Sequence, residues 1–279
     1  MQNSVIVLIL TYNEEENIEQ CLRSVEGWAS EIHIIDSGST DGTLQKIKSF
    51  DVKLTSNNFI NFSQQRNFAL NQIRQDYDGW ILFLDADEYL TPEIKVEISL
   101  RISSERFTNY FLNRKFYWQN KWIKRGYYPC NIIRLFKNGY ARCEDRSVNE
   151  HLSVTGGTGY IKENFIHKCN KPISYWVEKH IQRAKLEASE LFVTPNNKPK
   201  LRFSNNKVET KRWIRIYVWQ KLPIFIRPFL LFFFRLFIQG GIFDGRRAFG
   251  YHFLQTLWFT MLIDIFYLDR KLRGLKNND

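Results

Sequence analysis

The sequence predicts an α/β fold with a mostly parallel sheet flanked by helices, followed by a basic and aromatic helical tail. Strand-like and helix-like segments alternate over the first hundred residues, which is the pattern of a parallel sheet. The runs at 5–10 and 80–84 are continuously apolar, as expected for strands that are buried on both faces. The excess positive charge lies in residues 198–279, which indicates a second region of different character.

Short apolar runs that end in polar or turn-forming residues are predicted as strands. These runs are 5–10, 31–35, 52–55 and 80–84. Helices are expected between them: from Asn13, as the N-cap residue, to about Val25, over 43–50, over 63–74, and from Pro92 onward, since proline suits the first helical position.

From about residue 107 the pattern changes to aromatic, alternating segments at 110–118, 132–136 and 160–167, and a helix is predicted over 173–192. Residues 193–206 contain several Asn and Pro residues and read as a linker. We therefore predict a first domain over 1–192, with halves at 1–105 and 106–192. A linker over 193–207 and a helical region over 208–279 follow.

The composition suits a folded protein with an uneven charge distribution. Of the 279 residues, 44% are hydrophobic and 16% aromatic, enough for a full-sized core. Residues 1–197 carry 24 basic and 24 acidic side chains, whereas residues 198–279 carry 16 and 5, which accounts for the net charge of +11. Four cysteines without paired spacing favour reduced thiols in a cytosolic protein. No basic segment precedes Val5–Leu10, so this run is predicted as a strand and not as a signal peptide.

Polar clusters follow three of the predicted strands, at Thr11–Glu14, Asp36–Asp41 and Asp85–Asp87. In open α/β sheets ligands bind outside the carboxyl ends of the strands, so these clusters indicate one site. Asp85 and Asp87 can hold a divalent cation, one directly and one through water. Such a cation, Mn²⁺ or Mg²⁺, would neutralise the diphosphate of a sugar nucleotide. The alternative is that the two aspartates cap a turn or form salt bridges.

Taken together, the three motifs resemble those of the inverting family 2 glycosyltransferases, which have a GT-A fold, a Rossmann-like α/β architecture. Phe62–Leu70 resembles a helix start common in that family, and Arg146–His151 resembles its acceptor-side motif. Gly241–Gly250 resembles the tail of a bacterial branch that includes the lipopolysaccharide-core β-glucosyltransferases. The resemblance implies a nucleotide-sugar half at 1–105 and an acceptor half at 106–192.

The resemblance also implies roles for individual residues. A UDP-sugar site would be lined by Thr11, Tyr12, Asn13, Glu14, Asp36, Arg66, Asp85 and Ala86. Asp36 would accept a hydrogen bond from the uracil ring, Asp85 would face the ribose or the metal through water, and Asp87 would be the direct metal ligand.

Several of these residues have a second interpretation. Arg66 would meet a phosphate or be an exposed helix cation, and Asp36 would contact the nucleotide or build its turn. Asp41 is predicted to build that turn. His167 would complete the metal shell or only make a hydrogen bond at a strand end.

An inverting transfer requires a base that removes the proton of the acceptor hydroxyl while this oxygen attacks the anomeric carbon. Glu150 matches the family position of that base, and Glu144 and Asp145 are rivals. Lys179 and Arg183, four residues apart on the predicted helix 173–192, would meet the diphosphate or only be solvated.

The tail contains two apolar stretches, 222–238 and 248–268, that polar residues and prolines interrupt. A spanning helix needs about 20 uninterrupted apolar residues. Interfacial amphipathic helices on an anionic membrane surface fit better, with the protein cytoplasmic and peripheral on the inner face of the cytoplasmic membrane. The alternatives are an ordinary helical subdomain or a nucleic-acid surface, and the aliphatic density disfavours the second, so no nucleic-acid partner is expected.

The predicted function is the transfer of one hexose from a UDP-sugar to a lipid-linked or lipopolysaccharide-core saccharide. Glu209–Trp213 only partly matches the Gln-x-x-Arg-Trp motif of processive relatives, which favours single addition. A nucleotidyltransferase is a second possibility, but Asn13–Glu16 is acidic where a basic, Gly-rich phosphate loop is expected. An inactive membrane adaptor is a third, and the retained aspartates and candidate base argue against it.

Overall fold

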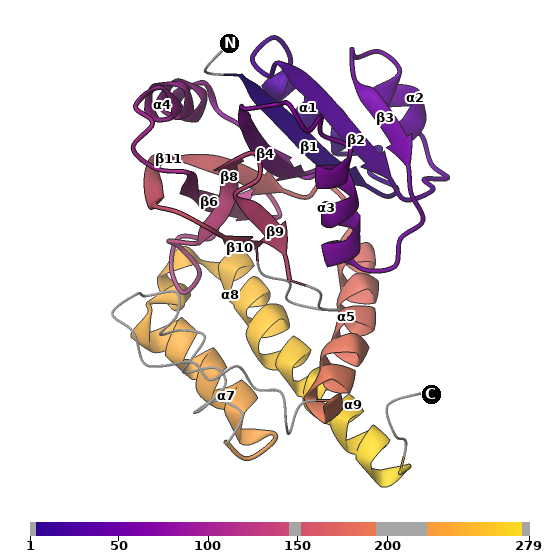
Figure 1. The fold of residues 1–279 in the computed structure, drawn as a ribbon. Coiled ribbons are helices and arrows are strands. Elements are labelled where there is room, and N and C mark those ends of the chain that lie inside the picture. Colours follow the sequence, from indigo (N-terminus) through magenta and orange to yellow (C-terminus); the bar gives the residue numbers. More distant parts are fainter. Residues whose placement is uncertain (1–3, 145–151, 194–221, 275–279) are drawn as a thin grey trace. The chain divides into compact units, whose positions relative to one another are not determined.

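The computed structural model describes residues 4–144, 152–193 and 222–274. The chain divides into two compact units, one up to Pro172 and one from Ile173 onward. Figure 1 shows their helices and strands. Each unit is described by itself.

The first unit is built on one sheet with the strand order β3-β2-β1-β4-β8-β6-β11-β5, and β7 pairs with β6. The strands are β1 (Val5–Thr11), β2 (Glu31–Asp36), β3 (Lys53–Ser56), β4 (Trp80–Asp85), β5 (Glu88–Tyr89), β6 (Asn109–Trp118), β7 (Lys121–Trp122), β8 (Asn131–Lys137) and β11 (Thr158–Lys168). Strands β1 to β4 are parallel, as are β6 and β11, whereas β8 and β5 run antiparallel to their neighbours. The predicted mostly parallel sheet is confirmed.

Helices cover both faces of this sheet. They are α1 (Ile18–Val25), α2 (Thr43–Ile47), α3 (Phe62–Asn71) and α4 (Pro92–Ser103). In β1, Val7 and Ile9 pack in the same core as α1, α2 and α4, and Ile6 and Leu8 pack in the core that includes Ala69 of α3. Because alternate side chains of a strand point to opposite faces, this double coverage explains the uninterrupted apolar run.

The start of the first helix differs from the prediction. Helix α1 begins at Ile18, and its N-cap residue is Asn17, whose side chain makes no capping hydrogen bond. Asn13 instead has a positive φ of 53°, a conformation that asparagine tolerates better than most residues. The prediction of Asn13 as N-cap is wrong because its side chain is used by a loop on the neighbouring strand.

A separate hairpin of β9 (Ala141–Cys143) and β10 (Leu152–Val154) lies beside α3. The Asn67 side chain joins the two elements: its amide nitrogen donates to the Cys143 carbonyl at 3.0 Å and its oxygen accepts from the Cys143 N–H at 2.9 Å. Residues 145–151, which connect the two strands, lie outside the described residues. The predicted base Glu150 and its rival Asp145 are among them.

The second unit is helical in its described part. It contains α5 (Ile173–Val193), α7 (Ile226–Phe233), α8 (Arg246–His252) and α9 (Phe259–Leu272), and short π-helical stretches extend α7 to Ile238 and join α8 to α9. Ala184 and Ala188 of α5 pack against Phe259 and Ile263 of α9. Helix α5, predicted as the end of the first domain, thus packs with the tail. Nearly all of the predicted linker 193–207 is not described, so that boundary stays a prediction.

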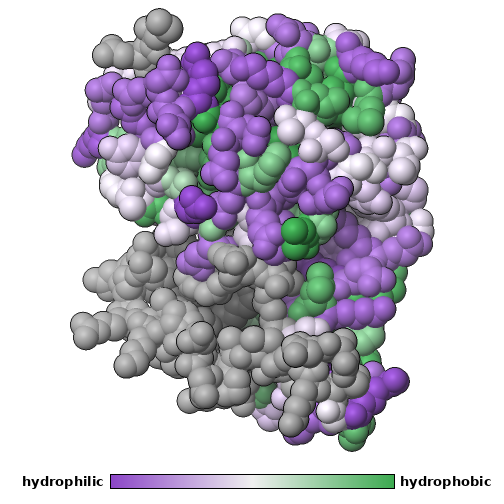
Figure 2. Space-filling model, turned by 45° about the vertical axis from the view of Figure 1, so that its right-hand side comes forward, coloured by the Kyte–Doolittle hydropathy of each residue, from purple (hydrophilic) through white to green (hydrophobic). Residues whose placement is uncertain are grey.

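On the face drawn in Figure 2, hydrophilic residues predominate and apolar residues form small separate groups. The four cysteines, Cys21, Cys130, Cys143 and Cys169, are free thiols. Among the described helices, none combines the length and the apolarity that crossing a bilayer requires.

Candidate active site

The carboxyl ends of β1, β2 and β4 lie side by side, and this brings the three polar motifs together. Thr11 is opposite Asp36 in the β1–β2 register, and Leu10 is opposite Asp85 in the β1–β4 register. The Thr11 hydroxyl donates a hydrogen bond to the Asp36 carboxylate at 2.9 Å. The motifs meet at one edge of the sheet because parallel strands present their carboxyl ends on the same side.

Asp36 and Asn13 stabilise the loop that follows β2. The Asp36 carboxylate accepts hydrogen bonds from the backbone N–H groups of Gly38 (2.9 Å) and Ser39 (2.8 Å) and from the Ser39 hydroxyl (2.5 Å). The Asn13 N–H donates to the Ser39 hydroxyl at 2.8 Å, and its side-chain oxygen accepts from the Thr40 N–H at 2.8 Å. These contacts belong to the turn-building interpretation of Asp36. Its contact with a uracil ring stays a prediction.

The same loop is fastened by Asp41, while Tyr12 points outward. The Asp41 carboxylate accepts from the N–H groups of Glu15 (3.2 Å) and Thr43 (3.0 Å), so Asp41 builds the turn as predicted. Tyr12 is 53% exposed at the carboxyl end of β1. Its ring is therefore accessible to a planar base, which stacks well on aromatic side chains.

Glu14 is held by a lysine from a distant part of the first unit. Its carboxylate accepts from Lys171 Nζ at 2.8 Å and from the Asn17 side-chain amide at 2.7 Å. Burial, and next the negative charge of Asp87, raise the pKa of Glu14, whereas Lys171 and Asn17 act in the opposite direction. The effect of Asp87 indicates that Glu14 belongs to the same electrostatic site.

Asp85 is held between two arginines. Arg134 Nη2 lies 2.6 Å from Asp85 Oδ2, and Arg66 Nη2 lies 3.2 Å from Asp85 Oδ1. The same Arg134 nitrogen lies 2.8 Å from Oε1 of the fully buried Glu88. Although burial alone would raise it, the positive charges of Arg134 and then Arg66 hold the pKa of Asp85 well below its usual range. Asp85 is thus an anion with its oxygens engaged by protein cations.

Asp87 lies in the same cluster, next to His167. Asp87 Oδ2 is 3.3 Å from His167 Nε2, and both side chains remain partly exposed. The other ring nitrogen of His167 is 3.5 Å from Glu88 Oε1 and 3.5 Å from Arg114 Nη1. The charged groups of Glu88 and Arg114 therefore orient the His167 ring. The predicted pair Asp87 and His167 is brought together.

These residues fit a divalent cation that protein and diphosphate would hold jointly. In the described part of the chain, no group of three or more His, Cys, Asp or Glu side chains forms a complete cage. Mg²⁺ is usually bound by one or two carboxylates together with substrate phosphates, and Mn²⁺ also accepts imidazole. Asp87 and His167 would supply such a partial donor set, whereas the Asp85 oxygens are paired with arginines.

Sequence reasoning named Arg66 but missed the other cations of the site, Arg134 and Lys171. Arg134 is a lone charged residue inside the apolar strand β8, and it is 4% exposed. A charged side chain in a buried strand needs an oppositely charged partner. Arg134 could therefore have indicated from the sequence that carboxylates lie next to it. Lys171 and Glu88 carried no comparable signal, because their partners Glu14 and Arg134 lie far away in the sequence.

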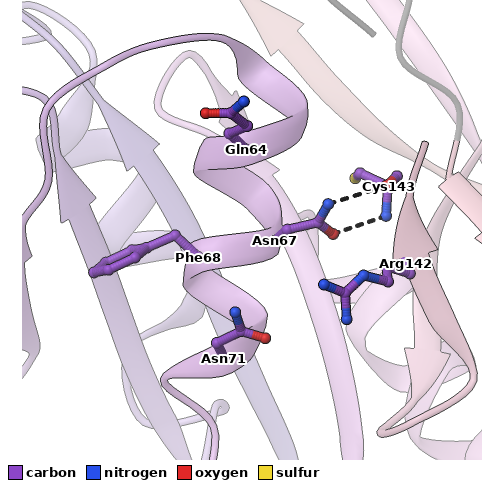
Figure 3. A pocket seen from close by; sticks show the side chains of 6 residues that line it. All are labelled: Gln64, Asn67, Phe68, Asn71, Arg142 and Cys143. Atoms are coloured by element: carbon purple, nitrogen blue, oxygen red, sulfur yellow. Dashed lines mark hydrogen bonds between the residues drawn. The ribbon is translucent and has the colours of Figure 1, made fainter. Parts of the chain in front are cut away.

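A groove of about 480 Å³ lies between α3 and β9 (Figure 3). It is lined by Gln64, Asn67, Phe68, Asn71, Arg142 and Cys143. In Figure 3 Asn67 and Arg142 approach each other from the helix and the hairpin, and the Asn67 side chain bonds the Cys143 backbone. Glu144, the rival for the base that the structure describes, follows the lining residue Cys143 in the chain and makes contacts of its own.

Lys179 and Arg183 lie on α5, in the second unit. Lys179 Nζ is 5.9 Å from the centre of the Tyr175 ring, and Arg183 Nε is 3.2 Å from Glu187 Oε1. Both contacts lie within the helix, and the diphosphate role of these two residues stays a prediction.

Known proteins resemble this chain over most of its length. An uncharacterized glycosyltransferase of Rickettsia bellii is 26% identical over 261 residues, covering 88% of this chain and 84% of the relative. The lipopolysaccharide core biosynthesis glycosyltransferase LpsC of Rhizobium meliloti is 30% identical over 163 residues, covering 54% of this chain and 57% of LpsC. The crystal structure of residues 1–349 of TarS from S. aureus covers 98% of this chain and 92% of that one, with 14% identity and a TM-score of 0.48, a likeness too slight to carry a conclusion.

The family itself is identified by residues 6–153, which match the family described as glycosyl transferase family 2. This match spans more than half of the chain and includes the three motifs at the carboxyl edge of the sheet, together with Arg134. The protein is therefore a glycosyltransferase, and the chain belongs to glycosyl transferase family 2.

Proposed function

We propose that this enzyme transfers one hexose from a UDP-sugar to a saccharide of the lipopolysaccharide-core type, with inversion at the anomeric carbon and with a divalent cation. The observation that carries the proposal is the accessible pair of Asp87 and His167, 3.3 Å apart, beside an Asp85 that is already neutralised by arginines. This arrangement leaves one carboxylate and one imidazole available for a cation on the diphosphate.

The donor would lie along the carboxyl edge of the sheet. The exposed Tyr12 ring supports stacking of the uracil base, and Arg66 supports contact with a phosphate, since its guanidinium already reaches this edge. Asp87 and His167 would hold the cation, with Asp85 in contact through water. When bound, the cation neutralises the charge that develops on the departing diphosphate.

The acceptor side rests on the relative LpsC and on the groove between α3 and β9. LpsC is named for lipopolysaccharide core biosynthesis, which supports a related acceptor for this chain. Gln64 and Asn71 carry amides and Arg142 carries a guanidinium, and these groups hydrogen-bond sugar hydroxyls and acidic sugar substituents. We place the acceptor saccharide in this groove.

The chemical step needs one proton acceptor. As the acceptor oxygen forms its bond to the anomeric carbon, the bond to the diphosphate breaks on the opposite face, and the hydroxyl proton passes to a carboxylate. Glu150 is proposed for this role on the family resemblance. It lies outside the described residues, six positions after Glu144 in the sequence.

The deciding experiment is calorimetric titration of UDP into the full chain with and without Mn²⁺, for wild type and Asp87→Asn. Asp76→Asn is the matched control, since Asp76 is an exposed aspartate on a loop of the same unit. We expect Mn²⁺ to strengthen UDP binding in wild type and in Asp76→Asn. In Asp87→Asn this gain should fall by roughly 10-fold or more, as for loss of a charged contact.

Transfer is then measured with a panel of UDP-hexoses and a lipopolysaccharide-core acceptor, and the anomeric configuration of the product is read by NMR. An unchanged Mn²⁺ effect in Asp87→Asn would contradict the metal site. A product that retains the donor configuration would contradict inversion while leaving the metal site intact.

A further inference from the structure

The helical stretch from Ile226 to Ile238 has two apolar faces. Phe232 and Leu236 are buried, and the Phe232 ring packs edge-to-face on Phe249 and Phe253 of the α8 segment at 5.9 and 6.3 Å between ring centres. This inward face accounts for the folding of the helix. The outward face should then be polar in an ordinary surface helix.

The outward face is instead made of large apolar side chains. We call this set the α7 stripe: Ile226, Phe229, Leu230, Phe233, Phe234, Phe237 and Ile238, all of them exposed. Their spacing of three and four residues places them on one side of the helix. Phe233 and Phe237 stack on each other at 5.5 Å in this exposed position. Soluble proteins rarely expose contiguous apolar surface on this scale unless it binds something.

The turn after the helix also exposes large apolar side chains. Gly240, with a φ of 72°, reverses the chain, and Ile242 and Phe243 follow as exposed residues. Ile238 and Phe243 are each 76% exposed. Two further apolar side chains thus follow the end of the α7 stripe.

Among the described residues, the first exposed charges that follow the α7 stripe in the chain are positive. Arg246 and Arg247 are exposed directly after the turn. The acidic residues nearby point inward: Asp244 is buried, and Asp264 is fully buried in an ion pair with Arg227. Because a second copy of the chain would bring the same positive charge to the contact, self-association over this face is electrostatically disfavoured.

We propose that the α7 stripe lies in the headgroup region of an anionic lipid bilayer, with its phenylalanine and isoleucine side chains among the upper acyl chains and Arg246 and Arg247 on lipid phosphates. Interfacial helices of this kind combine a buried apolar face with basic residues. The positive net charge of residues 198–279 complements such a surface. This inference concerns where the enzyme works and does not depend on which sugar it transfers.

The test is flotation of the full chain with phosphatidylcholine vesicles that contain or lack phosphatidylglycerol. The variant is Phe233→Gln with Phe237→Gln. The matched control is Val96→Gln with Leu100→Gln on α4, two exposed apolar residues with the same spacing of four. We expect wild type and control to float with the anionic vesicles only. The stripe variant should bind at least about tenfold more weakly, since burial of each ring favours the membrane by more than that factor.

Circular dichroism melting of all three proteins shows whether they are folded, and light scattering reports their oligomeric state. Equal flotation of the stripe variant and wild type would overturn the proposal, as would no flotation of folded wild type. A wild-type dimer that the stripe variant abolishes, without lipid binding, would assign the stripe to a second copy instead. None of these readouts requires transfer activity, so failure here is separate from failure of the proposed reaction.

Discussion

The two units of this chain use a buried arginine in different ways. In the first unit Arg134 connects Asp85 and Glu88 and forms the back of an edge whose front, Asp87 and His167, is accessible. In the second unit Arg227 pairs with the fully buried Asp264, which also accepts from the Phe225 N–H at 2.9 Å. The first pair lies beside the proposed nucleotide-sugar site, and the second joins α7 to α9. The first is the better candidate for a functional role, because groups next to it are partly exposed.

The surfaces of the two units also differ in polarity. The first unit gathers charged and polar groups at the edge where its parallel strands end, and its core takes up the apolar residues of β1 and β4. The second unit turns the α7 stripe outward. The first unit is thus marked by polar and charged groups at one sheet edge, and the second by exposed apolar side chains on one helix.

The largest effect is expected from the proposed base. Glu150→Gln should lower the transfer rate about 10²–10⁴-fold, the usual contribution of a general base. UDP binding should stay unchanged, because the substitution keeps the size of the side chain. Stopped assays with labelled donor measure the rate, and Glu144→Gln is the control. Loss of transfer in Glu144→Gln with activity retained in Glu150→Gln would move the base to Glu144.

The second prediction separates the two buried arginines. Arg227→Met should lower the free energy of unfolding by about 3–5 kcal/mol, since it removes the charged partner of the buried Asp264. Arg134→Met should lower it less, because Asp85 keeps Arg66 and Glu88 keeps Arg114 at 3.8 Å. Urea unfolding measures this loss. Only Arg134→Met should also weaken Mn²⁺-dependent UDP binding, measured below the unfolding temperature. If Arg227→Met weakens UDP binding equally, the functional contrast between the two pairs fails.

A third, smaller effect concerns the groove between α3 and β9. Arg142→Ala should raise the acceptor KM roughly tenfold or more, the expected result of losing a hydrogen bond to a charged group. The kcat and the donor KM should change little. Arg106→Ala, at an exposed arginine elsewhere in the first unit, serves as the control. A change confined to kcat would place Arg142 at the reacting atoms and not in acceptor binding.

The smallest effect is a pH dependence that belongs to the second unit. Burial, and also the positive charges of Arg183 and Lys179, lower the pKa of His180 from its ordinary 6.5 to about 4. A histidine that is kept neutral in the folded state contributes stability above pH 6.5, and this contribution is lost as the pH falls toward 4. Thermal melting between these pH values should therefore show a decline that His180→Gln reduces. An identical decline in His180→Gln would assign it to other groups.

Much of the first unit could be predicted from its sequence. The predicted strands at 5–10, 31–35 and 80–84 became β1, β2 and β4, and the unbroken aliphatic run at 5–10 is stable only where both faces of a strand are covered. The convergence of their polar ends follows from the parallel direction alone. The Asn13 cap was predicted incorrectly, since the bond from Thr40 that holds Asn13 joins positions 27 residues apart.

By itself, the sequence determined the alternation of strands and helices, the family motifs and the placement of positive charge in the last part of the chain. These are local or compositional properties that periodicity and residue type express directly. The tertiary structure alone decided that Asp85 is neutralised by Arg134 and Arg66, that Asp87 meets His167, and that one apolar face of α7 points outward. Each of these depends on which distant segments come into contact, and no local pattern encodes that choice.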